Sequence, residues 1–176
     1  MLARERGSRD TSGMDPDATS AYQRLEDRAS ARAALIAELG QAHQELRLFE
    51  RDAGFWDLDG AEFCAAVDAF LRRSQFTRAT LILHDSSALE GRAVRLPAII
   101  ERFAPRLQVR ETEPEIRSYA LGVVIIDQSV VLRRPHFDRG FAALDRDPSA
   151  IAAAAKLFDE LLEHSTPAPP ARATGL

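Results

Sequence analysis

Residues Tyr119–Phe141 read YALGVVIIDQSVVLRRPHFDRGF, and this stretch decides the fold of the chain. A run of branched apolar residues leads into Asp127, which predicts a buried strand that ends there. A tight turn around Gln128–Ser129 follows, and a second apolar run leads into Arg133 and Arg134. The stretch therefore predicts a β-hairpin with an aspartate at the end of its first strand.

Helices and strands are predicted to alternate before this hairpin. The expected helices are Ala29–Gln44, a helix capped by Asp59 with Phe63 and Val67 on one face, a helix carrying Leu96 and Ile99, and a last helix opened by Asp147 and Pro148. The expected strands are Glu45–Glu50, Arg78–His84 and Leu107–Arg110. Successive β-α-β units require parallel pairing, with the helices as crossovers. We therefore expect an α/β fold with a mixed, mostly parallel sheet and helices on both faces.

Polar ends flank the region that carries this periodicity. Residues 1–20 have few apolar residues and are expected to be disordered, with Met14 as an alternative start of translation. Residues 165–176, STPAPPARATGL, are rich in proline and are expected to form a disordered tail. Residues 21–164 then form a single α/β domain, and 45% of the chain is apolar, which suffices for one core.

Composition excludes several classes of protein. The formal net charge of −4 gives no overall attraction to nucleic acids or anionic membranes. The longest apolar run, Ala120–Ile126, is too short to span a membrane, and the N-terminus lacks the apolar core of a signal peptide. The single cysteine, Cys64, excludes an internal disulfide and indicates a cytoplasmic protein. The four histidines lack metal-ligand spacing and there is no glycine-rich phosphate loop, so neither a metal nor a cofactor is expected.

Six short segments carry a resemblance to a known family. They are ELRLF (Glu45–Phe49), LILHDS (Leu81–Ser86), VRETEPEIRSYA (Val109–Ala120), VVIID (Val123–Asp127), LRRP (Leu132–Pro135) and KLFDELLEHS (Lys156–Ser165). Through them the chain resembles an uncharacterised proteobacterial domain that occurs alone or fused behind a GNAT-type acetyltransferase. The order of elements over residues 30–164 also resembles one repeat of the phospholipase D fold.

The phospholipase D resemblance implies a fold without its best-known chemistry. The catalytic motif of that superfamily is His-x-Lys-x-x-x-x-Asp, in which the histidine attacks phosphorus and the lysine holds the phosphate charge. If Asp127 is the motif aspartate, the histidine falls on Ala120 and the lysine on Gly122. The only lysine of the chain is Lys156, so a His-x-Lys pair occurs nowhere. The resemblance also implies a homodimer, because single repeats of this fold commonly pair.

Arginines near the predicted strand ends are the candidate ligand-binding residues. The expected set is Arg110, Arg117, Arg133 and Arg134, with Asp127 and Asp85 beside them. The planar guanidinium bonds phosphate in a bidentate manner, so the set could hold an anion. Acidic residues interleave with these arginines, so a charged face of surface ion pairs is the alternative. Asp127 and Asp85 are also typical turn aspartates.

The leading functional hypothesis is a catalytically inactive phospholipase D-like module that binds a protein partner or a phosphate-bearing ligand. A role as accessory to an acetyltransferase is one form of this hypothesis. One alternative is a phosphodiesterase or nuclease with a rearranged site that uses His84 or His136. The other is a nucleic-acid-binding module, which the net charge disfavours. Under the leading hypothesis, replacing Arg133 and Arg134 with alanine should abolish anion binding and leave the fold intact.

Overall fold

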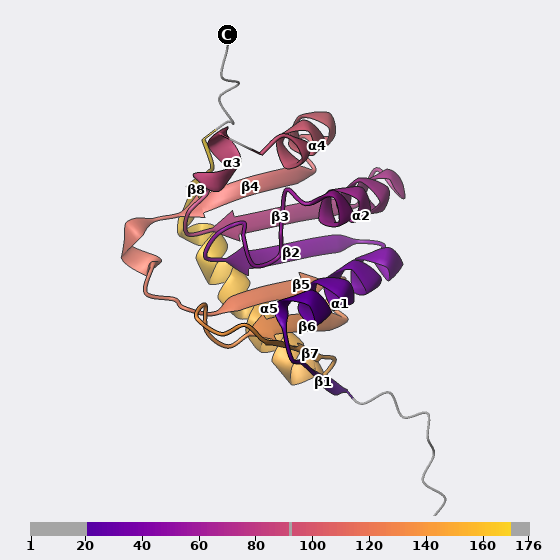
Figure 1. Cartoon of the computed structure of the whole chain (residues 1–176), viewed down its shortest axis with the longest axis vertical. Helices are drawn as coiled ribbons and strands as arrows, with labels where there is room; N and C mark the ends of the chain where they lie inside the picture. Colours follow the sequence, from indigo (N-terminus) through magenta and orange to yellow (C-terminus); the bar gives the residue numbers. More distant parts are fainter. Residues whose placement is uncertain (1–20, 92, 170–176) are drawn as a thin grey trace, which may run out of the picture.

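One sheet and its flanking helices make up the part of the chain that the computed structural model describes, residues 21–91 and 93–169 (Figure 1). The strands are β1 Tyr22–Leu25, β2 Glu45–Glu50, β3 Arg78–Leu83, β4 Leu107–Thr112, β5 Gly122–Ile126, β6 Val130–Arg134, β7 Ala142–Asp145 and β8 Ser165–Pro167. The helices are α1 Arg28–Gln41, α2 Ala61–Arg72, α3 Ala88–Gly91, α4 Arg95–Phe103 and α5 Pro148–Glu163, with a 3₁₀ turn at Pro114–Ile116. The strand order is β1-β7-β6-β5-β2-β3-β4-β8.

The sheet is mixed, as expected, but the prediction that it is mostly parallel is wrong. Only β2–β3 and β3–β4 are parallel, and the other five pairings within the described ranges are antiparallel. The early β-α-β units supply the two parallel pairings, and the second half of the chain takes part in all five antiparallel ones. There, β5, β6 and β7 follow one another through connections too short for a crossover, so they pair antiparallel.

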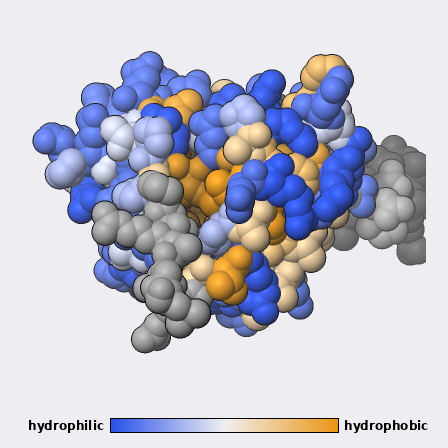
Figure 2. Space-filling view, turned by 90° about the horizontal axis from the view of Figure 1, so that it is seen from above, coloured by the Kyte–Doolittle hydropathy of each residue, from blue (hydrophilic) through white to orange (hydrophobic). Residues whose placement is uncertain are grey.

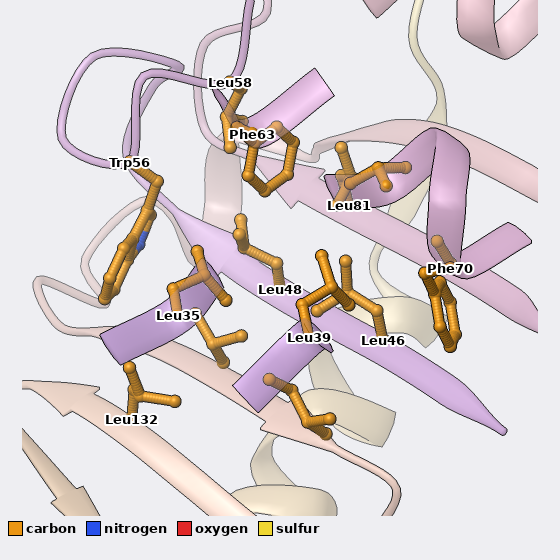
Figure 3. Packing of buried hydrophobic residues seen from close by; sticks show 14 of the residues in the cluster. Leu35, Leu39, Leu46, Leu48, Trp56, Leu58, Phe63, Phe70, Leu81 and Leu132 are labelled. Atoms are coloured by element: carbon orange, nitrogen blue, oxygen red, sulfur yellow. The ribbon is translucent and has the colours of Figure 1, made fainter. Parts of the chain in front are cut away.

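Helices cover both faces of the sheet, as predicted, and create two apolar cores. On one face, α1, α2 and α4 pack on alternate residues of the central strands. Figure 3 shows Leu35 and Leu39 of α1 beside Leu46 and Leu48 of β2 in this core. On the other face, α5 packs Phe158 and its neighbours against the remaining residues of the same strands. The central strands are therefore buried on both sides, which explains their nearly continuous apolar sequence.

Aspartates set the helix starts, though not always as the sequence indicated. Asp147 caps α5 as predicted, accepting hydrogen bonds from the backbone N–H groups of Ser149 and Ala150. Asp59 does not cap α2, whose N-cap is Gly60. Its carboxylate instead accepts from the first N–H groups of α4, at 2.8 Å and 2.7 Å for Arg95 and Leu96. A cap that acts across 36 residues leaves no local sequence signal.

The C-terminal boundary predicted at residue 164 needs correction. Ser165–Pro167, expected to lie in a disordered tail, forms β8 on the edge of β4. The backbone groups of alternate residues face β8 on this edge, namely those of residues 109, 111 and 113. Two hydrogen bonds show this, from Ala168 N–H to the Val109 carbonyl and from Glu113 N–H to the His164 carbonyl. Pro167 lies between these pairs, where its missing N–H would point away from the sheet. An edge strand accepts proline at such positions.

The prediction of disorder for residues 1–20 and 170–176 lies outside the described residues. No helix within the described ranges is both long and apolar enough to cross a membrane.

Candidate functional site

The candidate site lies where β2, β3 and β4 end, beside the start of β5 and the end of β6. Because β5 runs antiparallel to β2, its first residue, Gly122, lies next to Glu50. Gly122 is in turn paired with Arg134 of β6. Alternation along the strands places these three residues on the face that α1 and α2 cover. A row of glutamate, glycine and arginine therefore crosses three adjacent strands.

Glu50 and Arg134 form a buried ion pair across this row. Arg134 Nη1 donates to Glu50 Oε1 at 2.8 Å, with 6% of the arginine and 0% of the glutamate side chain exposed. Gly122 of β5 lies between the two partners and leaves room for their side chains to meet. A Cβ at that position would lie 2.5 Å from Glu50 Oε2. The same Cβ would lie 3.3 Å from Arg134 Cβ. Any side chain at residue 122 would therefore collide with the pair.

Arg134 is held by further contacts around its guanidinium. Its Nε donates to the Arg139 carbonyl at 2.9 Å and its Nη2 donates to the Phe137 carbonyl. The guanidinium also lies 4.0 Å from the centre of the Phe55 ring. These contacts hold the Arg134 side chain in the core, so its role is structural.

Burial disfavours the charged form of both partners, so it shifts their pKa values in opposite directions. Burial raises the pKa of the Glu50 carboxyl, against the opposing effects of the Arg51 backbone N–H and of Arg134. Burial likewise lowers the pKa of the Arg134 guanidinium, which Glu50 partly offsets. Glu50 Oε2 is buried without a hydrogen-bond partner in the described residues. Burying these two charges costs free energy, and removing either residue would leave the other charge buried without a partner.

His84, the residue after β3, is locked on the opposite face of the sheet. Its Nε2 lies 2.8 Å from the Tyr119 carbonyl and its Nδ1 lies 2.6 Å from Thr112 Oγ1. A carbonyl only accepts, so Nε2 carries the proton and Nδ1 accepts from the hydroxyl. Burial lowers the pKa of His84, aided by the charge of Arg117. Both nitrogens of a neutral ring are therefore already engaged.

Arg117 and Asp85 lie near the ends of β3 and β4, but each has a local partner. Arg117 Nη2 contacts Glu111 Oε1 at 2.9 Å, and the other oxygen of Glu111 accepts from Ser86 Oγ at 2.5 Å. Asp85 accepts from the Ser87 N–H at 2.9 Å, and bonds from Ser87 lower the pKa of Asp85. Asp85 is thus an ordinary turn aspartate in this structure.

Asp127 lies at the far end of β5 from Gly122, so it does not join the site. Its carboxylate accepts from the backbone N–H groups of His43, Gln44 and Glu45 at 2.6 to 2.8 Å. With φ angles of 51° and 53°, Asp127 and Gln128 are the central residues of the turn, one residue earlier than predicted. Two positive φ values are typical of a type I′ hairpin turn.

The remaining arginines of the expected set are also dispersed. Arg110 donates to the hydroxyl and the carbonyl oxygen of Ser165, which fastens β8 to β4. Arg133 pairs with Asp145 at 2.7 Å, and 44% of its side chain is exposed. Because neighbouring residues on a strand point to opposite faces, Arg133 and Arg134 do not meet. The expected residues therefore do not converge on one ligand site.

Sequence reasoning missed Glu50 as a member of the site. A glutamate that ends the apolar strand ELRLFE was the available signal, because a charged residue there must either face solvent or find a buried partner. Gly122 was noted only for the lysine that it does not carry. Within residues 21–91 and 93–169, no group of three or more histidine, cysteine, aspartate or glutamate residues is arranged to hold a metal ion.

Solved structures share this fold at low sequence identity. Nuc of Salmonella typhimurium, a phospholipase D family member, has a TM-score of 0.60 at 14% identity over 84% of this chain and 97% of its own. NucT of Helicobacter pylori has a TM-score of 0.58 at 13% identity, over 84% and 99%. The archaeal chromatin protein TrmBL2, whose structure shows a mode of DNA binding, has a TM-score of 0.62 at 15% identity. That match covers 86% of this chain but 56% of TrmBL2.

These likenesses establish a phospholipase D-like fold and nothing more specific. No curated protein matches the chain. A family model described as a domain of unknown function, DUF7931, matches residues 27–174. The chain therefore belongs to the DUF7931 family.

Proposed function

We propose that this domain is a catalytically inactive phospholipase D-like module that binds a protein partner. The observation that supports the proposal best is the Glu50–Arg134 pair above Gly122. The resemblance places the catalytic lysine at residue 122, and there the carboxylate of Glu50 fills the space that a side chain would need. Because Glu50 already pairs with Arg134, this point offers no free cation to hold a phosphodiester. Ala120, at the histidine position, supplies no nucleophile.

A phosphodiesterase with a rearranged site is less well supported. Of its two candidate histidines, His84 has both ring nitrogens hydrogen-bonded inside the protein. His136 is half exposed in the loop after β6, 3.5 Å from Asp138. Arg117, the member of the expected set whose charge acts on His84, is itself paired with Glu111. The rearranged-site alternative therefore lacks both a free histidine to attack phosphorus and a lysine to hold the phosphate charge.

A protein partner is favoured over a phosphate-bearing ligand by the pairing of the arginines. Arg117 and Arg133 contact carboxylates, Arg134 is buried, and Arg110 holds β8. An anion would have to displace an internal partner at each of these positions. Binding to an acetyltransferase, as the resembling family implies, is one form of this role.

Nucleic-acid binding is the remaining alternative, and the fold shared with TrmBL2 is its only support. Such binding should weaken steeply with added salt, because it releases counterions from the phosphates. We expect no salt-dependent retention of DNA or RNA by this domain.

Hydrolysis of bis(4-nitrophenyl) phosphate and of a labelled oligonucleotide, with and without EDTA, tests the proposal. A phosphodiesterase of known activity serves as the positive control for the assay, and we expect no turnover by this domain above buffer. Turnover that survives chelation and disappears in His84→Gln or His136→Gln would establish the rearranged-site alternative instead.

A thermal-shift titration with inorganic phosphate, nucleotides and coenzyme A tests the choice of ligand. The variants to use are Arg117→Ala and Arg133→Ala, whose side chains are exposed, rather than Arg134→Ala, whose side chain is part of the core. We expect no shift of melting temperature with these anions. A shift of several degrees that either variant abolishes would replace the protein partner with an anionic ligand.

A further inference from the structure

An apolar groove lies at the β8 edge of the sheet, away from the Glu50–Arg134 pair. Its volume is about 460 Å³, and α3, α4, β4 and the residues after β8 form its walls. The lining residues are Ser86, Leu89, Pro97, Ile100, Glu101, Val109, Ala168 and Pro169. Seen from this end of the molecule, apolar side chains gather in the middle of a largely hydrophilic surface (Figure 2). Exposed apolar surface of this kind often marks a binding site, because covering it removes apolar side chains from water.

The chain itself runs into the groove. Ala168 is held at the wall by a 2.9 Å bond from its N–H to the carbonyl of Val109, and Pro169 is the last described residue. The next bond of the β4–β8 ladder would need an N–H from residue 170, which is proline. Pairing with β4 must therefore end at this point, because proline has no donor. Whatever follows Pro169 starts from the groove.

The length and charge of the following segment fit the groove. Residues 170–176 read PARATGL, and seven extended residues reach about 23 Å, more than the roughly 14 Å length of the nine-residue α4. The segment has one charged side chain, Arg172. The groove has one carboxylate, Glu101, which is exposed and forms no ion pair within the described ranges. The family match continues to residue 174, so most of the segment belongs to the domain.

We propose that residues 170–176 dock in this groove, with Arg172 beside Glu101 and the apolar residues over Leu89, Ile100 and Val109. A tether this short gives the segment a local concentration on the order of millimolar, so even weak docking keeps the groove covered. A partner that used the same groove would first have to displace the segment. The docking is independent of whether the domain hydrolyses phosphodiesters.

The test compares the full chain with a chain that ends at Pro169. A synthetic peptide of residues 169–176, PPARATGL, is titrated into each protein by isothermal titration calorimetry. We expect one peptide to bind per truncated chain, and the full chain to bind it at least tenfold more weakly. Truncation should also increase the fluorescence of 8-anilinonaphthalene-1-sulfonate, a dye that binds exposed apolar surface.

Variants of the truncated chain assign the binding to the groove. Glu101→Arg should weaken the peptide at least fivefold, and a peptide carrying Arg172→Glu should restore the loss. Phe76→Ser is the matched control, because Phe76 is 73% exposed and does not line the groove. It should leave binding unchanged.

Three outcomes overturn the proposal. One is a folded truncated chain, by circular dichroism, that does not bind the peptide. Another is binding that is insensitive to Glu101→Arg. The third is a truncated chain that covers the groove by dimerising, as seen by sedimentation velocity, with no response to the peptide.

Discussion

At the scale of single residues, neighbours in the sequence have opposite roles. Arg133 and Arg134 form an adjacent pair that indicated a joint anion site. Strand alternation turns the half-exposed Arg133 toward the buried Asp145, and turns Arg134 into the core against Glu50. Arginine is therefore replaceable at position 133, whereas at position 134 it is part of the core.

Removing Arg134 should destabilise the domain strongly. Arg134→Ala leaves the buried Glu50 carboxylate without its partner, and we expect the free energy of unfolding to fall by about 3–5 kcal/mol. The double variant Glu50→Gln/Arg134→Met should recover most of this loss, because no buried charge remains. Urea denaturation followed by circular dichroism measures both. Arg133→Ala is the comparison variant and should cost clearly less, because 44% of the Arg133 side chain is already exposed in the folded chain; equal losses for the two single variants would contradict the assignment.

The buried imidazole of His84 predicts a pH dependence. Folding lowers its pKa below the ordinary value of 6.5, so the unfolded chain takes up a proton first as the pH falls. Its contribution to stability is therefore complete above about pH 6.5 and is lost as the pH falls through the folded pKa.

His84→Gln, which keeps a side-chain N–H for the Tyr119 carbonyl, should flatten the decline of unfolding free energy between pH 7 and pH 5. The slope should differ from wild type by up to about 1.4 kcal/mol per pH unit. Urea denaturation at pH 7, 6 and 5 provides the measurement. If His136→Gln flattens the slope as much, the effect does not belong to the buried ring.

At the scale of elements, polar side chains join segments that are distant in the chain. Asp59 caps α4 from the loop before α2, and Asp127 ties the β5–β6 turn to the connection between α1 and β2. Neither aspartate contacts a candidate ligand site. Both therefore belong to the assembly of the fold.

Asp127→Ala should loosen this junction. The change removes the acceptor of three backbone N–H groups and places alanine at a positive φ, so we expect a loss of about 2–4 kcal/mol in unfolding free energy. Asp127→Asn tolerates the same φ and keeps one oxygen, so it should lose clearly less. Chemical denaturation distinguishes them, and a loss below about 0.5 kcal/mol for the alanine variant would show that water replaces the carboxylate.

At the scale of the whole molecule, β8 closes one edge of the sheet. It returns from α5 to pair with β4, so the two ends of the described chain lie at opposite edges of the sheet (Figure 1). Arg110 and the ladder bonds from β4 fasten it there. Ser165–Pro167, the start of the proline-rich stretch that suggested a tail, is therefore part of the sheet.

A chain that ends at His164 should be less stable than a chain that ends at Pro169. Loss of the ladder and of the Arg110 contacts should cost about 1–2 kcal/mol, which lowers the melting temperature by about 3–8 °C in a domain of this size. Differential scanning calorimetry of the two chains measures the difference. Identical melting temperatures would mean that β8 adds nothing to the stability of the sheet.

The sequence could predict the central strands, the long helices and the phospholipase D-like order of elements, because apolar periodicity of 2 and 3.6 residues is a local property. It also predicted helices on both faces, since buried strands need cover on each side. It could not predict β1, β7 and β8, which are short and take their order from pairing with distant strands.

By itself the sequence determined the α/β class with a mixed sheet and the absence of a His-x-Lys pair, because both follow from residue types and their spacing. Only the tertiary structure decided which charges meet. Glu50 lies 84 residues from Arg134, and their pairing depends on β5 lying between their strands with a glycine at the crossing point. Such a contact is a property of strand order and register, which no local pattern contains.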